Sequence, residues 1–203
     1  ISEIELLGKD EVPRYHPAVA NHLAKTAALR PRGMAQMVET DPGQEHALTV
    51  DPGRVIDLTG QMAEDGTLNW DAPAGNWSLI RFGYTTTGAV NAPATEAGKG
   101  LECDKMDTLA LNLHFEQFPA RLIDAAGEMA GNTFKYLFID SWECKYQNWT
   151  DNLPGEFEKR RGYSMIPFLP VLCGAVVESS DKTEAFLNDF RLTIADMIEE
   201  YYY

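Results

Sequence analysis

The sequence predicts an α/β protein, with a β-rich, sandwich-like part over residues 1–92 and the first units of a parallel β/α arrangement over 93–203. Short apolar segments between Pro/Gly breaks dominate the first part, as is typical of short strands. In the second part, strand-like and helical patterns alternate, which indicates β/α units. Only about two such strands are recognised, so we expect a barrel that is incomplete in this chain.

The best-defined pattern of the first part is a hairpin. Its strands are 66–70 and 77–84, and the turn 71–76 contains Pro, Gly and Asn. Apolar and aromatic side chains alternate along both strands, and such hairpins are typical of β-sandwiches. Other elements expected here are short strands over 4–7 and 55–58 and a helix over 15–30.

The second part carries clear helical signals. Asp107 can cap a helix that reaches about residue 126, with a kink expected at Pro119. A second helix is predicted over 154–161, since Pro154 suits a first turn and Gly162 ends the pattern.

A last helix follows, and Asp181 with Glu184 forms its expected capping pair. Its apolar residues recur at helical spacing and predict a buried stripe: Phe186, Phe190, Ile194, Met197 and Tyr201. This pattern runs to Tyr203 without a C-cap signal, so we expect the chain to be part of a longer polypeptide.

The strongest functional signal is segment 134–143, an apolar, β-forming run that ends in Asp140, Ser141, Trp142 and Glu143. Side chains at the carboxyl ends of barrel strands face the active-site mouth. Trp can stack on the apolar face of a sugar, and beside Glu143 it can raise the pKa of that carboxyl by desolvation. We therefore interpret Glu143 as a catalytic acid and Asp140 and Trp142 as substrate-binding residues. The alternative is an acidic turn with Trp142 in the core.

A second pair of carboxylates, Glu102 and Asp104, lies on one face of the short strand expected over 100–105. If the two strands are adjacent and parallel, these carboxylates lie at the same mouth as Asp140. Three such oxygen donors can bind a sugar or a calcium ion, although no dedicated calcium loop is present. Lys105 can instead pair with one of the acids.

Composition excludes some classes of partner. The net charge is −14, from 17 Lys and Arg against 31 Asp and Glu, which argues against nucleic acids and anionic membranes. No apolar run approaches the length of a membrane span. Three cysteines without zinc spacing leave the redox compartment open.

Several motifs together resemble glycoside hydrolase family 106, the large α-L-rhamnosidase-type enzymes, over roughly residues 50 to 203. The later motifs are Gly100-Leu-Glu-Cys-Asp-Lys105, Ile139-Asp-Ser-Trp-Glu143, Lys159-Arg-Arg-Gly-Tyr163 and Pro167-Phe-Leu-Pro170. The earlier ones are Val55-Ile-Asp-Leu-Thr59, Asp65-Gly-Thr-Leu-Asn-Trp70, Pro73-Ala-Gly-Asn-Trp77 and Arg81-Phe-Gly-Tyr-Thr-Thr-Thr-Gly88.

This resemblance implies a multi-domain bacterial enzyme in which a β-sandwich region leads into a (β/α)8 barrel. It implies inverting hydrolysis of terminal α-L-rhamnosides by two glutamates, with calcium at the active site. Glu143 matches the general acid, and Glu102 and Asp104 are sugar- or metal-site candidates. The second glutamate is expected outside this chain, so the 203-residue piece alone should be inactive. A periplasmic or secreted location follows from the family's polysaccharide substrates.

Two other functions remain open. One is a non-catalytic carbohydrate-binding module in which Trp70, Trp77 and Trp142 are stacking platforms. The other is a purely structural segment whose acids are surface charge.

Overall fold

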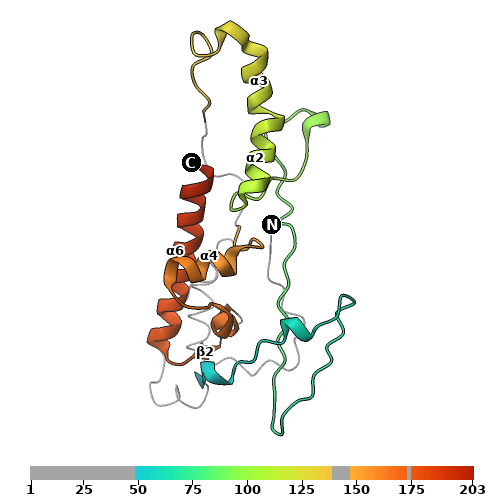
Figure 1. The fold of residues 1–203 in the computed structure, drawn as a ribbon, viewed down its shortest axis with the longest axis vertical. Coiled ribbons are helices and arrows are strands. Elements are labelled where there is room, and N and C mark those ends of the chain that lie inside the picture. The colour runs from blue at the N-terminus through green and yellow to red at the C-terminus, as the bar shows by residue number, and fades with distance from the viewer. Residues whose placement is uncertain (1–48, 139–146, 173–174) are drawn as a thin grey trace. The chain divides into compact units, whose positions relative to one another are not determined.

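The structure is a computed structural model that describes residues 49–138, 147–172 and 175–203. The strand expected over 4–7, the helix expected over 15–30 and the sites Asp140, Trp142 and Glu143 lie outside the described residues. Figure 1 follows the elements along the chain: β1 (Thr49–Val50), η3 (Pro52–Arg54), η4 (Thr59–Gln61), η5 (Glu96–Gly98), α2 (Thr108–Gln117), α3 (Pro119–Ala126), η6 (Gly127–Met129), α4 (Leu153–Arg161), η7 (Ile166–Phe168), α5 (Leu169–Leu172), β2 (Val176–Val177) and α6 (Ser180–Tyr202).

The chain divides into two compact units, and each is described by itself. Among the described residues, the first unit comprises 83–138, 147–156 and 193–203. The second unit comprises 49–82, 157–172 and 175–192. None of the helices in the described ranges is both long enough and apolar enough to cross a membrane.

The core of the second unit is a cluster of aromatic rings around Phe186, which is 1% exposed. Phe186 stacks on Phe168 with ring centroids 5.4 Å apart and also contacts Phe157 and Phe190. Tyr163 meets Phe157 edge-on at 5.0 Å, and its hydroxyl donates to Asp189 Oδ2 at 2.9 Å. Apolar burial of this kind is the main stabilising contribution to a core.

A short parallel pair of strands lies in the same unit. Thr49 pairs with Val176 and Val50 with Val177. The Thr183 hydroxyl accepts from the Val177 N–H at 3.0 Å and donates to the Val177 carbonyl at 3.1 Å. This side chain ties β2 to the first turn of α6.

The residue that caps α6 differs from the one predicted. Asp181 and Glu184 were expected to cap this helix, but the helix begins at Ser180. Ser179 is the cap, because its hydroxyl accepts from the Lys182 N–H at 3.2 Å. A Ser directly before the helix satisfies a free N–H there, so Asp181 lies within the first turn, where its charge suits the helix dipole. The predicted stripe is confirmed at its centre by Phe190, 3% exposed, and Met197, fully buried.

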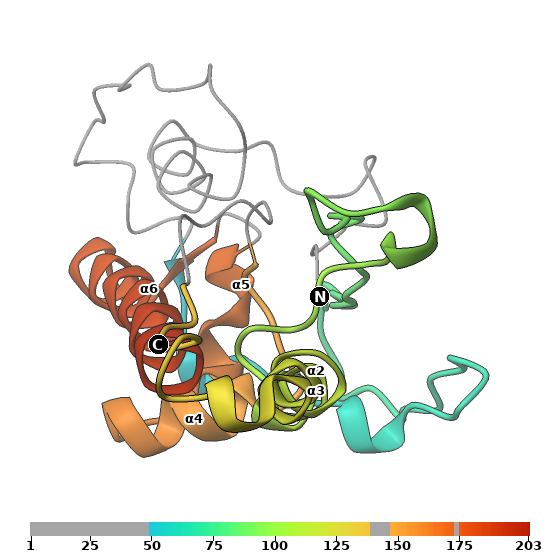
Figure 2. The ribbon, with the colours of Figure 1, turned by 90° about the horizontal axis from the view of Figure 1, so that it is seen from above.

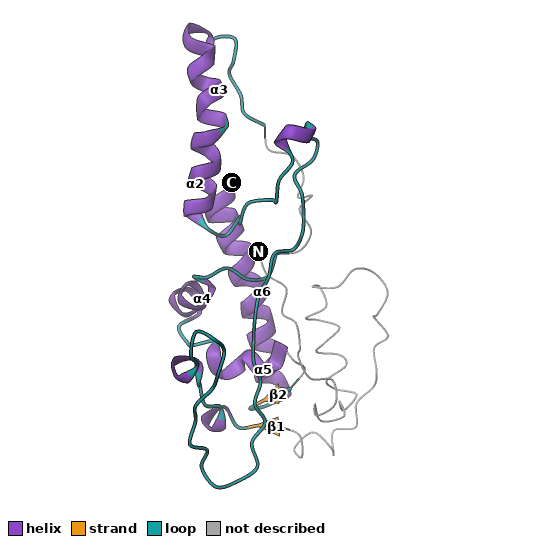
Figure 3. Cartoon of the chain, turned by 90° about the vertical axis from the view of Figure 1, so that its right-hand side faces the viewer, coloured by secondary structure: helices purple, strands orange, loops and turns teal. Residues whose placement is uncertain are grey.

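The helix expected from Asp107 to about 126, with its kink, is confirmed as α2 and α3. Asp107 caps α2 by accepting from the Leu109 N–H at 2.9 Å, and Pro119 opens α3 after a break at Phe118. The two helices follow one another almost in line in Figure 3 and overlap when seen from above in Figure 2. They carry large apolar side chains that are exposed, namely Leu109, Leu113, Phe115, Phe118 and Leu122.

The predicted helix 154–161 is also confirmed, as α4, and Gly162 follows it with a φ of +81°. At that φ a side chain is strained, so glycine suits this position. This helix was predicted correctly because residues in its own sequence mark both its beginning and its end.

The expected strands are not confirmed. In the described residues, segments 55–58, 66–70, 77–84 and 134–138 do not form regular strands, and β1 and β2 have two residues each. Where a strand was expected over 100–105, one isolated antiparallel bridge joins Leu101 to Val90. A strand needs a neighbour that pairs with it over several residues, and in the described residues these segments make at most isolated bridges, such as Met62 to Leu68 and Ala130 to Phe134. The sandwich, the barrel and the boundary at residue 92 therefore stay predictions.

Replacing Phe186 by alanine should lower the free energy of unfolding by about 3–5 kcal/mol, the usual cost of deleting a buried aromatic ring. Chemical denaturation followed by circular dichroism measures this. The control is Asn188→Ala at an exposed position of the same helix, for which a change within about 0.5 kcal/mol is expected. Equal effects of the two substitutions would contradict the assigned core.

Candidate functional site

The candidate site in the first unit is a group of polar side chains from two segments that are far apart in the sequence. We call it the polar cluster. One segment supplies Glu102, Asp104 and Lys105, and the other supplies Gln147 and Asn148. Lys105, Gln147 and Asn148 are 5–6% exposed, which is rare for charged and amide side chains unless they have partners.

The first segment is positioned by backbone and side-chain hydrogen bonds to the chain just before it. The Asn91 N–H donates to the Gly100 carbonyl at 3.1 Å, and Asn91 Oδ1 accepts from the Gly100 N–H at 2.8 Å. The Glu102 N–H donates to the Ala89 carbonyl at 3.0 Å. After the cluster residues, Met106 is buried at 2% exposure and anchors the other end.

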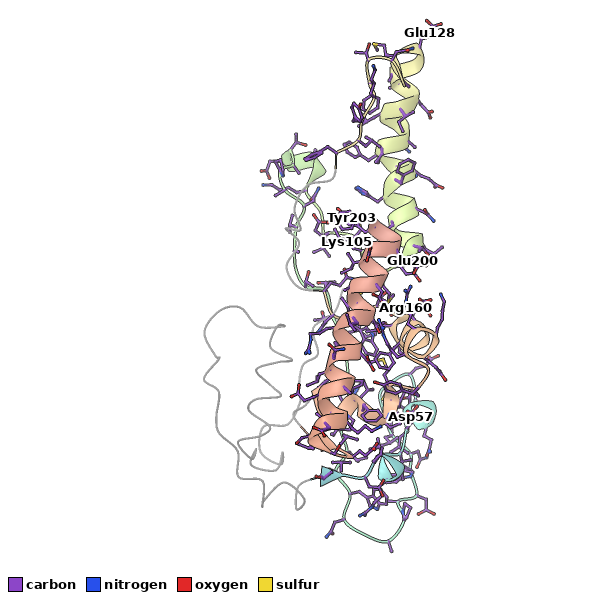
Figure 4. All side chains as sticks on the ribbon, turned by 90° about the vertical axis from the view of Figure 1, so that its left-hand side faces the viewer. Asp57, Lys105, Glu128, Arg160, Glu200 and Tyr203 are labelled. Carbon is purple, nitrogen blue, oxygen red and sulfur yellow. The ribbon has the colours of Figure 1, made fainter. Side chains whose placement is uncertain are left out.

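Lys105 and Glu102 form an ion pair that is largely shielded from water. The Lys105 Nζ lies 2.5 Å from Glu102 Oε2, and the two side chains are 7% and 23% exposed. The ammonium also lies 5.4 Å from the ring centroid of Tyr202, within cation–π range. Figure 4 labels Lys105, and also Tyr203, which directly follows α6. The pairing of Lys105 with one of the acids, an alternative left open above, is therefore confirmed for Glu102.

Asp104 is held by a bridge from Gln147. Asp104 Oδ1 accepts from the Met106 N–H at 2.8 Å and from the Gln147 side-chain amide. Gln147 Oε1 accepts from the Lys105 N–H at 3.2 Å. One side chain thus uses both ends of its amide to join the two segments of the cluster.

One buried acceptor in the cluster has no donor. Asn148 Oδ1 is inaccessible and makes no hydrogen bond in the described structure. Leaving a buried polar atom unpaired costs about 1–3 kcal/mol, so such atoms are few in native proteins. Within the described residues, the cluster therefore leaves one buried acceptor unsatisfied.

A second polar group follows Asn148 directly. Trp149 stacks on Tyr84 at a centroid distance of 6.4 Å, and the Tyr84 hydroxyl donates to Asp151. That hydrogen bond and the negative charge of Asp151 raise the pKa of Tyr84 above its usual value. Tyr84 is 54% exposed, so this group lies at the surface of the described residues.

Cys103 lies between the two acids of the cluster and is half-buried. Burial raises the pKa of its thiol, and the nearby Lys105 ammonium only partly offsets this. A thiol that stays protonated is a poor nucleophile, so Cys103 is not interpreted as a catalytic residue.

The structure thus places two of the predicted site residues together, since Glu102 and Asp104 belong to one cluster. The other expected mouth residues, Asp140, Trp142 and Glu143, lie outside the described residues. Gln147 and Asn148 were missed by the sequence reasoning. The run of polar and aromatic residues over 147–151, four residues after Glu143, was the available signal.

Glu102 and Asp104 do not by themselves fit a calcium ion. Calcium in proteins takes about six to eight oxygen ligands. The Lys105 ammonium lies against Glu102, and Asp104 Oδ1 already accepts two hydrogen bonds. Across the described ranges, no three His, Cys, Asp or Glu side chains are grouped so that they could hold a metal. No chemical step is therefore assigned to calcium.

Trp70 and Trp77, two of the three tryptophans proposed as stacking platforms, do not favour a carbohydrate-binding module. Trp70 and Trp77 meet edge-to-face, with centroids 5.4 Å apart and planes at 82°, and the Trp77 indole donates to the Pro73 carbonyl at 2.8 Å. A sugar-stacking platform requires an open ring face. These two rings are instead packed on each other.

Comparison with known proteins gives three findings. A family model described as alpha-L-rhamnosidase, of glycoside hydrolase family 106, matches residues 4–203. A "Putative beta-glucuronidase" of Formosa agariphila is 42% identical over 149 residues, which are 73% of this chain and 13% of that protein. The solved structure of a rhamnosidase from Novosphingobium sp. PP1Y matches with a TM-score of 0.69 and 39% identity, over 75% of this chain and 15% of that chain. The chain thus spans 13–15% of the length of these two relatives.

Asp151→Asn should lower the pKa of Tyr84, because the acceptor charge that disfavours tyrosinate is removed. In the unchanged protein the stabilising contribution of this hydrogen bond is present below the ordinary pKa of 10.0 and is lost as pH rises through the raised value. An NMR titration of tyrosine ring carbons measures the shift, and Tyr84→Phe assigns the signal. An unchanged Tyr84 titration in Asp151→Asn would refute the interaction.

Proposed function

Since this chain belongs to the alpha-L-rhamnosidase family of glycoside hydrolases, we propose that the complete enzyme hydrolyses terminal α-L-rhamnosides with inversion at the anomeric carbon. The observation that carries the proposal is the family match, which extends over residues 4–203. The rhamnosidase neighbour, at 39% identity, supports the same substrate class.

In the proposed reaction Glu143 is the general acid. It protonates the oxygen of the leaving group while a water attacks the anomeric carbon from the opposite face of the sugar. The base that activates this water is a second carboxylate, contributed by a part of the enzyme outside this chain. In inverting enzymes the two carboxyl groups stand about 6.5–9.5 Å apart, which leaves room for the water.

The other site residues have binding roles in this proposal. Trp142 stacks on the sugar and shields Glu143 from water, and Asp140 accepts hydrogen bonds from sugar hydroxyls. Glu102 and Asp104 belong to the same sugar site. The contact that supports this is the Gln147 bridge, which joins Asp104 to a residue four positions after Glu143.

Glu102 and Asp104 can supply only a few of the ligands of a calcium ion. Lys105 neutralises Glu102, and Asp104 is held by hydrogen bonds, so these two residues supply few free ligand positions. A calcium ion at the active site of the complete enzyme would take most of its oxygen ligands from elsewhere in the polypeptide.

The substrate class is tested by activity of the complete enzyme on two aryl glycosides, an α-L-rhamnoside and a β-D-glucuronide. The two relatives carry names for these two different activities, so the comparison separates them. We expect hydrolysis of the rhamnoside, with the inverted sugar anomer as the first product in a time-resolved NMR spectrum. Preferred hydrolysis of the glucuronide would overturn the substrate class while leaving the glycosidase assignment in place.

Glu143→Gln in the complete enzyme should reduce turnover by about 10²–10⁴-fold, the usual contribution of a general acid. The loss should be much smaller on a dinitrophenyl rhamnoside, because that leaving group departs without protonation. The matched control is Glu128→Gln, the same chemical change at an exposed glutamate, which should leave activity unchanged. Near-normal activity of Glu143→Gln on a poor leaving group would refute the acid role.

A further inference from the structure

We propose that Lys105 is a positioning residue. Its buried ammonium holds one carboxylate oxygen of Glu102 and leaves the other oxygen to accept a hydrogen bond from a hydroxyl of the sugar. This inference rests on the proposed function, because it takes Glu102 as part of the rhamnoside site. It gives a role to a buried charge that the proposed reaction does not use.

The ion pair between Lys105 and Glu102 is buried mainly on the lysine side. The lysine side chain is 7% exposed and the glutamate side chain is 23% exposed. The ammonium donates to Glu102 Oε2 at 2.5 Å. Within the described ranges the second oxygen of Glu102, Oε1, receives no hydrogen bond. Each oxygen of a carboxylate can accept about two hydrogen bonds, so Oε1 keeps its full capacity to accept from a ligand.

The backbone that carries Glu102 is also fixed. Its N–H donates to the Ala89 carbonyl at 3.0 Å. Two residues earlier, Gly100 is bonded to Asn91 through both its carbonyl, at 3.1 Å, and its N–H, at 2.8 Å. With the backbone held in this way, the remaining freedom of Glu102 lies in its side-chain torsions. The contact with Lys105 restricts these torsions and so determines where Oε1 points.

Stability alone does not account for a lysine at this position. Lysine is almost never buried, and an ammonium at 6% exposure loses most of its hydration. Glu102 and the ring of Tyr202, whose centroid is 5.4 Å from the ammonium, compensate this loss. However, apolar residues in place of a buried ion pair are often neutral or stabilising. A buried charge that fixes a carboxylate is expected where the orientation of that carboxylate matters, as in a binding site.

A second lysine–glutamate pair in the same unit provides a matched contrast. Lys99 Nζ lies 2.5 Å from Glu96 Oε1, with the same spacing of three residues, but the two side chains are 50% and 89% exposed. An exposed pair of this kind contributes little to stability. The two pairs therefore share their chemistry, distance and sequence spacing and differ in burial, which makes Lys99 the control position.

The test uses the complete enzyme and four aryl α-L-rhamnosides. One carries the unmodified sugar, and three analogues each lack one ring hydroxyl, at C2, C3 or C4. In Glu102→Gln the amide oxygen stays with the Lys105 ammonium and the amide nitrogen faces the sugar, so the acceptor is lost. We expect kcat/KM to fall by about 10–100-fold on the unmodified sugar, the usual effect of losing a hydrogen bond to a charged group. On one analogue the fall should be less than about 3-fold, because the hydroxyl that Glu102 binds is already absent.

Lys105→Met retains the approximate volume of the side chain and removes the ammonium. It should lower kcat/KM by about 10-fold on the unmodified sugar, through misplacement of Glu102, and by less than about 3-fold on the same analogue. Each analogue is compared between variants, so its own reactivity cancels. Lys99→Met should leave all four activities unchanged. An equal loss on all four substrates, no loss, or a selective loss at a different hydroxyl would overturn the positioning role.

A second substitution covers the case in which Lys105→Met does not fold. Lys105→Arg keeps the charge, but a guanidinium can bond both oxygens of a carboxylate at once. Glu102 Oε1 is then no longer open to the sugar, and we expect the same selective loss. If Lys105→Arg treats the four substrates as the unchanged enzyme does, the proposal is overturned.

The outcomes separate this inference from the function on which it rests. If the unchanged enzyme does not hydrolyse the unmodified rhamnoside, the proposed function fails. If it does so, and Glu102→Gln or Lys105→Met shows no selectivity among the analogues, the rhamnosidase assignment remains and only the positioning role of Lys105 is overturned.

Discussion

Burial of a lysine ammonium is the physical constraint that organises the first unit. A charge at 6% exposure is tolerated only when it is paired and hydrogen-bonded. Lys105 meets this requirement through Glu102 and the ring of Tyr202, and its backbone N–H is satisfied by Gln147. Glu102 and Tyr202 therefore compensate the charge, and Gln147 holds the backbone of the residue that carries it. The carboxylates predicted from sequence as site residues are part of that network.

The helices could be predicted from the sequence because their signals are local. Asp107 and Pro119 each act on the turn in which they lie, and both appear where expected. The strands could not be predicted in this way, because a strand forms only by pairing with another strand, and the local sequence does not identify that second strand. Val176 and Val177 form a strand only through contact with Thr49 and Val50, about 127 residues earlier in the chain by their numbering.

The candidate site was predicted only in part, because some of its residues are recognisable from local sequence and others are not. Glu102 and Asp104 were recognised because carboxylates near a strand end suggest chemistry on their own. Gln147 and Asn148 were missed because an amide has no such signature, and its importance depends on what lies opposite it. The prediction for Glu143 concerns a residue outside the described part of the chain, so it stands on the motif Ile139-Asp-Ser-Trp-Glu143 and on the family.

The exposed apolar side chains of α2 and α3 have a consequence for handling the protein. Leu109 and Phe118 are 77% and 58% exposed, and apolar surface of this kind favours association in water. The net charge of −14 opposes association by mutual repulsion. Salt weakens that repulsion, since the screening length falls to about 10 Å at 0.1 M, but leaves the apolar attraction intact. Dilute buffer should thus keep the isolated 203-residue chain dispersed, and high ionic strength should drive it to precipitate.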